Sequence, residues 1–416
     1  MNSLQRPDSP HNLMLYFQVH QPRRLRPFQF FDIGSGGNYF DDDLNEEILN
    51  RIAIQCYLPT NQLLLDLIRK NPNIRVTFSI SGTTLEQFEQ YAPEVLLSFR
   101  DLASTGCVEF LGETYYHSLA CMLPGDEFEI QVMKHAQKIK EHFGVQPQVF
   151  RNTELIYSNE IGARISALGF KGILTDGIER VLCNRSPHHL YNHPTKTDLK
   201  IFLRNYRLSD DIAFRFDANE LTIDRYMSWL SQMPNDEKLV NLALDYETFG
   251  EHKKLQSGIL NFLKELLTSL ANYAAYRMIT PSQAMEHLSP HSQLNVPGYI
   301  SWADKERDLS AWLGNDMQRD AFDSLKKLEK NLETLDDPQL IHTWRQLQTS
   351  DHFYYMCTKG EEDGGVHSYF SPYCSPYEAF INYMNVISDF SLQIKNRLSA
   401  LRRSKRMRKT VLANAL

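Results

Sequence analysis

The sequence predicts an α/β protein in which parallel strands and helices alternate to form a closed or nearly closed barrel, followed by a helical domain. Three observations support this prediction. Short, almost continuously apolar runs recur through the first 280 residues, separated by longer stretches of helical character. From Asp316 onward the pattern changes to amphipathic helices with charged faces. The 416 residues, 42% of them hydrophobic, suffice for one large barrel with an appended helical part.

The apolar runs have the composition of strands that are buried on both faces of a parallel sheet. They are rich in β-branched and aromatic residues, and each is short enough to be a strand. The predicted strands are Leu13–Val19, Ile74–Ile80, Cys107–Leu111, Gln148–Arg151, Gly172–Thr175, Lys200–Arg204, Leu239–Leu244 and Tyr276–Thr280. The repeated strand–helix–strand pattern favours a parallel barrel, with an open doubly wound sheet as the alternative. No glycine-rich dinucleotide fingerprint follows any of these runs, so a nucleotide cofactor is not supported.

Helical periodicity between these runs predicts a helix over Thr84–Leu102 and another over Asp126–Phe143, with Gly144 placed for a C-cap. Similar patterns predict later helices over Met317–Thr334, Pro338–Thr349 and Pro376–Leu401.

These patterns divide the chain into a barrel domain over residues 1–300 and a helical domain over residues 301–416. We expect the helical domain to contribute to the active-site cleft of the barrel. It ends in a basic tail from Arg402 to Lys409, which we interpret as a solvated helix end rather than a site for an anionic partner.

Composition and charge exclude several classes of protein. The net charge of −7 argues against nucleic acid as the main partner. No apolar run approaches the roughly 20 residues that span a bilayer, and Met1 to Asn12 lack the apolar centre of a secretory signal. The six cysteines are scattered without a Cys-x-x-Cys pair, which favours reduced thiols. We therefore expect a cytoplasmic protein with no membrane or nucleic-acid partner, and the sequence leaves its oligomeric state open.

Polar residues follow several predicted strands at the point where each strand ends. In parallel barrels the chemistry lies at the carboxyl ends of the strands, so these residues are expected to meet at one face. They are His20 and Gln21 after the first run, Glu113 to His117 after the third, Glu154 after the fourth, Asp176 after the fifth, and Asp245 to His252 after the seventh.

Carboxylates gathered in this way cannot all remain ionised at close range, and their mutual repulsion raises the pKa of some of them. Glycoside hydrolysis needs that division, because one carboxylic acid protonates the leaving oxygen while another carboxylate attacks the anomeric carbon or activates water. Strand-end placement alone leaves five candidates: Glu113, Glu154, Asp245, Glu247 and Glu251.

Structural roles compete with these functional ones. Glu154 follows Arg151 by three residues, so an ion pair between them is an alternative, and Asp245 would also serve as an N-cap. His20, Asp245 and His252 offer ligand types that zinc accepts, but no His-x-x-x-His or His-x-x-Glu-His spacing is present. We therefore predict no catalytic metal.

At these residues the sequence resembles glycoside hydrolase family 57, and more closely its α-amylase-like branch, over nearly the whole chain. Any one of the motifs is weak evidence, whereas five in order, with both carboxylates at strand ends, are strong. The five regions are Val19–Pro22, Phe110–His117, Phe150–Leu155, Ala243–His252 and Ser301–Asn315.

The resemblance implies an incomplete (β/α)7 barrel followed by a helical domain, a retaining mechanism, no cofactor, and an α-1,4-glucan or maltooligosaccharide as substrate. It assigns the nucleophile to Glu154 and the acid/base to Asp245. We expect His20 and Glu113 to hold sugar hydroxyls, and Trp302 and Trp312 to stack on sugar faces or wall the cleft. The full set expected to bind substrate is His20, Gln21, Glu113, Tyr115, His117, His252, Trp302, Asp308 and Trp312.

Other functions share these residues or this fold. A 4-α-glucanotransferase or a branching enzyme would use the same two carboxylates, with a sugar in place of water. A zinc-dependent deacetylase or mannosidase and a catalytically silent glucan-binding protein are further alternatives. Several family members have a tryptophan a few residues before the glutamate, where this chain has Val149-Phe150-Arg151. Substrate preference is therefore not carried over from the family.

Overall fold

The computed structural model describes residues 10–218, 220–359 and 371–414. The chain forms two compact units. The first comprises Met1–Gln21, Glu46–His117 and Pro124–Ala303, and the second comprises Pro22–Asn45, Ser118–Leu123 and Asp304–Leu416. Two segments that follow barrel strands thus belong to the second unit, which sequence patterns did not indicate.

Seven parallel strands follow one another around the first unit in chain order. They are β1 (His11–Val19), β2 (Val76–Ile80), β3 (Val108–Phe110), β4 (Val149–Arg151), β5 (Gly172–Asp176), β7 (Lys200–Arg204) and β8 (Leu239–Asp245). β1 pairs with both β2 and β8. The ladders β2–β3, β4–β5 and β5–β7 continue the ring.

Two narrow seams complete this ring. A parallel bridge between Gly112 and Phe150 joins the end of β3 to β4. The Asn205 N–H donates to the Asn241 carbonyl at 2.8 Å, between β7 and β8. The prediction of a parallel α/β barrel is confirmed, with seven strands in the ring. The eighth predicted run forms β11 (Tyr276–Met278), which pairs with the first three residues of β1 and lies outside the ring.

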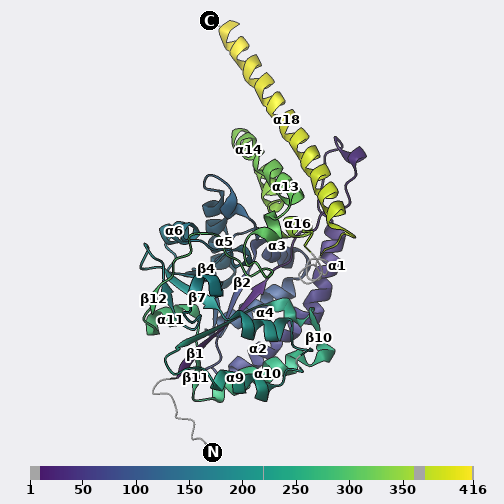
Figure 1. Cartoon of the computed structure of the whole chain (residues 1–416). Helices are drawn as coiled ribbons and strands as arrows, with labels where there is room; N and C mark the ends of the chain where they lie inside the picture. The colour runs from purple at the N-terminus through teal and green to yellow at the C-terminus, as the bar shows by residue number, and fades with distance from the viewer. Residues whose placement is uncertain (1–9, 219, 360–370, 415–416) are drawn as a thin grey trace, which may run out of the picture. The chain divides into compact units, whose positions relative to one another are not determined.

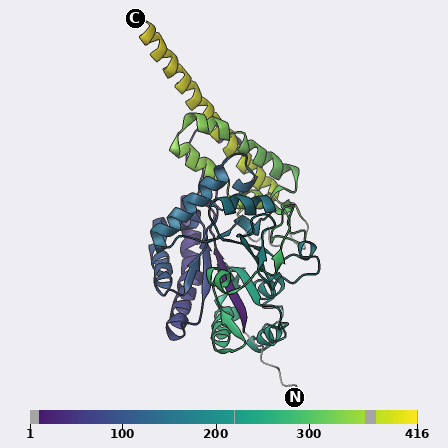
Figure 2. The same ribbon diagram turned by 90° about the vertical axis from the view of Figure 1, so that its left-hand side faces the viewer.

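Helices surround the strands of this unit (Figure 1 and Figure 2). They are α2 (Leu58–Lys70), α3 (Gly82–Tyr91), α4 (Pro93–Ser104), α5 (Glu127–Phe143), α6 (Asn159–Ala167), α7 (Glu179–Leu182), α8 (Tyr206–Ala213), α9 (Ile223–Ser231), α10 (Ile259–Asn272) and α11 (Pro281–His287). The single helix predicted over Thr84–Leu102 is wrong, because Ala92 leaves the helical conformation before Pro93, which starts α4. Gly144 caps α5 in the left-handed conformation, as expected.

The strands separate two hydrophobic cores. Because successive side chains of a strand point to opposite faces, Leu13, Leu15 and Phe17 of β1 pack outward against the helices. Met14 and Tyr16 point into the barrel, where they join residues of the other strands and of α11. This alternation also decides which residues at the strand ends face the barrel axis.

The second unit is mainly helical. Its helices include α12 (Ser310–Leu313), α13 (Asp316–Lys326), α14 (Glu329–Leu335), α15 (Pro338–Gln346), α16 (Ser350–Tyr354) and α18 (Pro376–Asn414). The predicted helix over Met317–Thr334 is therefore two helices. The segment Pro22–Asn45 belongs here because Asp389 of α18 accepts hydrogen bonds from the Tyr39 hydroxyl and the Gly34 N–H, each at 2.6 Å.

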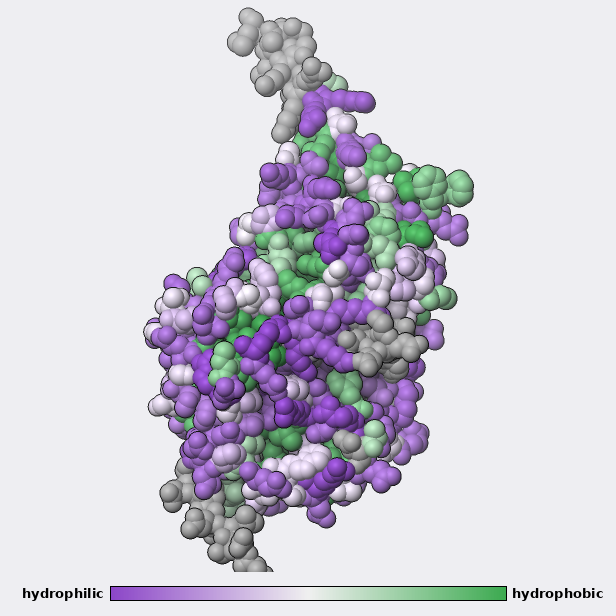
Figure 3. Space-filling view, viewed as in Figure 1, coloured by the Kyte–Doolittle hydropathy of each residue, from purple (hydrophilic) through white to green (hydrophobic). Residues whose placement is uncertain are grey.

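The helix α18 continues through the basic tail, where Arg402 and Arg403 are exposed. The face drawn in Figure 3 is largely hydrophilic, with smaller hydrophobic groups between. Among the described helices, none combines the length and apolar character needed to cross a bilayer. All six cysteines lie in the described part of the chain, and no disulfide joins any two of them.

Candidate active site

The alternation along the strands places a set of polar side chains at the mouth of the barrel. Apolar residues of the barrel interior occur on six of the ring strands or just after them, and a polar residue follows at the next inward position. Stepping two residues from Leu111, Val149, Leu174, Phe202 and Ala243 leads to Glu113, Arg151, Asp176, Arg204 and Asp245. On β1, stepping from Tyr16 through Gln18 leads to His20. The structure therefore brings together His20, Glu113, Asp176 and Asp245, which are four of the strand-end residues that the sequence singled out.

Glu154 occupies a short 3-10 turn directly after β4, with a left-handed backbone at φ 56°. Both of its carboxylate oxygens are held. His117 Nε2 lies 3.1 Å from Oε1, and the Trp302 indole N–H donates to Oε2 at 2.7 Å. The side chain remains 20% exposed, so a ligand can still reach it. A carboxylate held by two donors is fixed in one orientation.

The charges around Glu154 and Asp245 push their pKa values in opposite directions. Burial alone would raise the pKa of Glu154, but the hydrogen bond and charge of His117, with the charge of Arg151, lower it overall. Burial raises the pKa of Asp245 to about 6, and the negative charge of Glu154 adds to this effect. Glu154 is therefore the anion of the pair, and Asp245 is the carboxyl that keeps a proton in mildly acidic solution.

His117 lies between two carboxylates. Its Nδ1 is 3.3 Å from Oε2 of Glu113, and its ring stacks on His20 with the centroids 3.9 Å apart. Burial alone would lower the pKa of His117, but the hydrogen bonds to Glu113 and Glu154 raise it to about 9. Glu113 is fully buried and His117 is 2% exposed, so both lie behind the more accessible His20 and Glu154.

The segment that leaves β1 is held firmly. His20 Nδ1 lies 2.7 Å from the Ser81 hydroxyl, at the N-cap of α3. Gln21 is buried, and its backbone N–H donates to the Thr84 hydroxyl at 2.7 Å. His20 therefore faces the site. Gln21 is held through its backbone N–H, and its role in substrate binding stays a prediction.

Two arginines flank Trp302. The guanidinium carbons of Arg151 and Arg204 lie 5.3 and 5.5 Å from the centre of the Trp302 rings. Arg151 is fully buried, its nearest carboxylate oxygen is Oε2 of Glu113 at 3.8 Å, and within the described residues it forms no ion pair with Glu154. The alternative of an Arg151–Glu154 ion pair is therefore wrong. The site also contains Arg204, which the sequence reasoning missed, because Arg204 is the last residue of a predicted strand and only residues after the strands were considered.

Tyr115 and His252, two other predicted site residues, have contacts outside this cluster. The Tyr115 hydroxyl donates to Glu86 at 2.8 Å, and Lys134 Nζ lies over the Tyr115 ring. His252 neighbours Glu251 and two lysines, and burial lowers its pKa to about 4. Asp308 and Trp312 belong to the second unit, where Trp312 is 1% exposed and Asp308 accepts hydrogen bonds from Ser310. Roles of these residues in substrate binding stay predictions.

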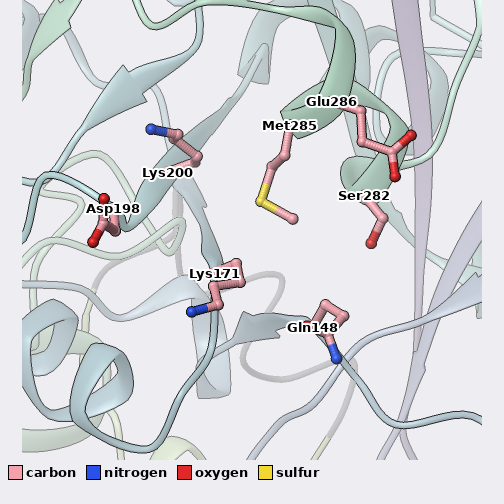
Figure 4. A pocket seen from close by; sticks show the side chains of 7 residues that line it. All are labelled: Gln148, Lys171, Asp198, Lys200, Ser282, Met285 and Glu286. Carbon is pink, nitrogen blue, oxygen red and sulfur yellow. The ribbon is translucent and has the colours of Figure 1, made fainter.

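The ligand set considered for a metal does not assemble. In the described ranges, His20, Asp245 and His252 form no cluster of ligand atoms close enough to share an ion. A separate hollow of about 320 Å³ lies at the opposite end of the barrel, next to the start of β4, β5 and β7 (Figure 4). Its lining includes Lys171, Lys200 and the Met285 side chain, and none of the carboxylates described above.

Comparison with known proteins supports a family assignment. The model of glycosyl hydrolase family 57 matches residues 14–297. A curated relative from Methanocaldococcus jannaschii, which carries the provisional name alpha-amylase, is 42% identical over 404 residues, covering 92% of this chain and 85% of the relative.

Solved structures share the fold at low sequence identity. A family 57 branching enzyme from Pyrococcus horikoshii has a TM-score of 0.68 and 14% identity, covering 90% of this chain and 88% of that one. The alpha-amylase AmyC from Thermotoga maritima has a TM-score of 0.65 and 13% identity, covering 94% of each chain.

Proposed function

Because the chain belongs to glycosyl hydrolase family 57 and is a glycoside hydrolase, we propose that it cleaves the α-1,4 bonds of α-glucans or maltooligosaccharides with retention of configuration. In this proposal Glu154 is the nucleophile and Asp245 is the general acid and base. The α-glucan substrate follows from the alpha-amylase name of the relative that matches most of the chain.

The assignment of roles rests on one observation, which is that the surroundings of Glu154 favour its anion and those of Asp245 favour its protonated form. Glu154 accepts hydrogen bonds from His117 and Trp302, which stabilise its anion. Asp245 is largely buried, and the Glu154 charge favours its protonated form. A retaining glycosidase needs this pairing of an anionic nucleophile with a protonated acid.

The reaction follows in two steps. Glu154 attacks the anomeric carbon while Asp245 gives its proton to the leaving glycosidic oxygen, which yields a covalent glucosyl ester and an ionised Asp245. Water then attacks the same carbon from the opposite face, Asp245 takes its proton, and the ester bond to Glu154 breaks. In this proposal His20, which is partly exposed and stacks on His117, holds a sugar hydroxyl.

Azide rescue on an aryl α-maltooligoside distinguishes the two roles, because such a leaving group departs without protonation. Glu154→Ala and Asp245→Ala should each lose nearly all hydrolysis of unactivated maltooligosaccharides. With azide, Glu154→Ala should form the β-glycosyl azide by direct displacement, whereas Asp245→Ala should form the α-glycosyl azide by attack on the ester intermediate. Near wild-type hydrolysis in either variant, or the opposite pairing of azide products, would overturn the assignment.

Transglycosylation is a second candidate, since the fold is shared with a branching enzyme and the chemistry needs the same two carboxylates. In that reaction a sugar hydroxyl replaces water in the second step. Incubation with maltotriose separates the two functions by product length. Glucose and maltose alone indicate hydrolysis, and products longer than maltotriose indicate transfer.

A further inference from the structure

Glu247 is a buried carboxyl beside the site that the proposed reaction does not use. It lies in the 3-10 turn Tyr246–Thr248, two residues beyond Asp245, and is 5% exposed. Its Oε1 accepts a short hydrogen bond from the Tyr57 hydroxyl and a second one, at 3.3 Å, from the backbone N–H of His20. It therefore links the end of β8 to the segment that follows β1.

This contact supports both residues that leave β1. Glu247 holds the backbone of His20, and the Tyr57 hydroxyl accepts a hydrogen bond from the Gln21 side chain at 3.4 Å. The Ser81 hydroxyl, at the N-cap of α3, holds the His20 ring on another side at 2.7 Å. The position of His20, and of the sugar hydroxyl that it is placed to bind, thus depends on Glu247.

The surroundings of Glu247 favour its neutral form. Among the described residues, the titratable residues around Glu247 include Asp245, Cys56, Tyr57, Tyr246 and His20, whose backbone N–H donates to it. Burial, followed by the charge of Asp245, raises the pKa of Glu247 to about 8. Glu251 offers a contrast in the same segment, because it forms ion pairs with Arg51 and Lys254.

We propose that Glu247 works as a neutral carboxylic acid, a positioning residue that fixes His20 and Tyr57 without placing a second negative charge beside Asp245. An ionised Glu247 would hold the proton on Asp245 more tightly and move its titration to higher pH. The neutral form leaves Asp245 able to release its proton to the leaving group and to recover one from water. The inference rests on the proposed function, because it concerns the same acid and base.

Comparison of Glu247→Gln with Glu247→Ala tests this proposal. Glutamine retains an acceptor for Tyr57 and His20 and is neutral, like a protonated glutamate. We expect Glu247→Ala to lose on the order of tenfold or more in kcat/KM, through the lost hydrogen bonds. Glu247→Gln should recover most of that loss and should keep the basic limb of the kcat/KM profile, set by Asp245 near pH 6, at the wild-type position.

Glu251→Gln is the matched control for removal of a buried acid from the same segment, and it should leave the basic limb in place. Two results would overturn the proposal. One is a shift of the basic limb by about one pH unit in Glu247→Gln, which would reveal a charge on Glu247. The other is unchanged kinetics in Glu247→Ala.

Asp245→Asn distinguishes these failures from failure of the proposed function. An active Asp245→Asn enzyme contradicts the function itself, whereas an inactive one confines the failure to Glu247.

Discussion

The two ring nitrogens of His117 reach two different carboxylates, Glu154 Oε1 at 3.1 Å and Glu113 Oε2 at 3.3 Å. A neutral imidazole carries one N–H, so both contacts are donated hydrogen bonds when the ring is protonated. The pKa of about 9 keeps it protonated at neutral pH. Glu154 thus faces a charged donor, which is stronger than a neutral one and stabilises the anion that a nucleophile requires.

Replacement of His117 by asparagine should therefore move the acid limb of the pH profile. Without the imidazolium, the pKa of Glu154 rises. The acid limb of the kcat/KM profile should therefore shift upward by about one pH unit, so that kcat/KM falls at low pH. The rate at the optimum should fall on the order of 100-fold. Measurement of kcat/KM against pH checks this result. His193→Asn is the control, because that ring contacts backbone groups around Asn159 and Lys196. An acid limb at the wild-type pH in His117→Asn would contradict the assignment.

Variants of Trp302 test whether its indole positions the nucleophile Glu154 or stacks on a sugar ring of the substrate. Its N–H donates to Glu154 at 2.7 Å. Phenylalanine keeps an aromatic face but lacks the donor, so Trp302→Phe should lower kcat by about tenfold or more, with a smaller change in KM. Trp302→Leu, which removes both properties, is the companion variant. If Trp302→Phe retains kcat and Trp302→Leu mainly raises KM, stacking on sugar is the role of this residue.

Asp245 should reduce the stability of the protein at neutral pH. Its pKa is raised from 3.8 to about 6 in the folded state, so folding favours the protonated form. The contribution of the protonated carboxyl to stability is fully present below about pH 4, near the pKa of the unfolded state. It is lost as the pH rises through 6, the pKa of the folded state. Asparagine cannot ionise, so Asp245→Asn should be more stable at pH 7, by on the order of 2 kcal/mol, and equally stable at pH 4. Thermal denaturation at both values measures the difference, and an equal gain at both would contradict this explanation.

Gly250 should tolerate no side chain. It has φ 134°, and a Cβ there would lie 2.0 Å from the Gln55 carbonyl oxygen. Gly250→Ala should lower the free energy of unfolding by roughly 3 kcal/mol or more, because the backbone must move to admit the Cβ. Gly258→Ala is the matched control, with φ 84° and nothing within 4 Å of its Cβ, so its cost should be about 1 kcal/mol. Chemical denaturation gives both values, and similar costs would show that the close approach to Gln55 relaxes easily.

Some parts of this site depend on contacts that local pattern does not encode. Tyr57 and Glu247 are 190 residues apart and meet because η2 (Ala53–Tyr57) packs against the 3-10 turn Tyr246–Thr248 that follows β8. Tyr115 follows a strand, as Glu113 does, but its ring packs against Gly82, where a Cβ would lie 2.5 Å from it. Strand-end position therefore indicated that Glu113 points to the barrel axis, but it did not indicate the packing of Tyr115, which depends on Gly82 of another segment.

The sequence by itself determined the ring strands and the carboxylates that follow them, because apolar runs and period-two alternation are local properties of a buried parallel strand. It therefore indicated that Glu154 and Asp245 lie at one end of the barrel. The tertiary structure alone decided how they differ. Protonation depends on burial and on the charges of His117, Arg151 and Arg204, which lie on or after separate strands and meet only when the barrel closes.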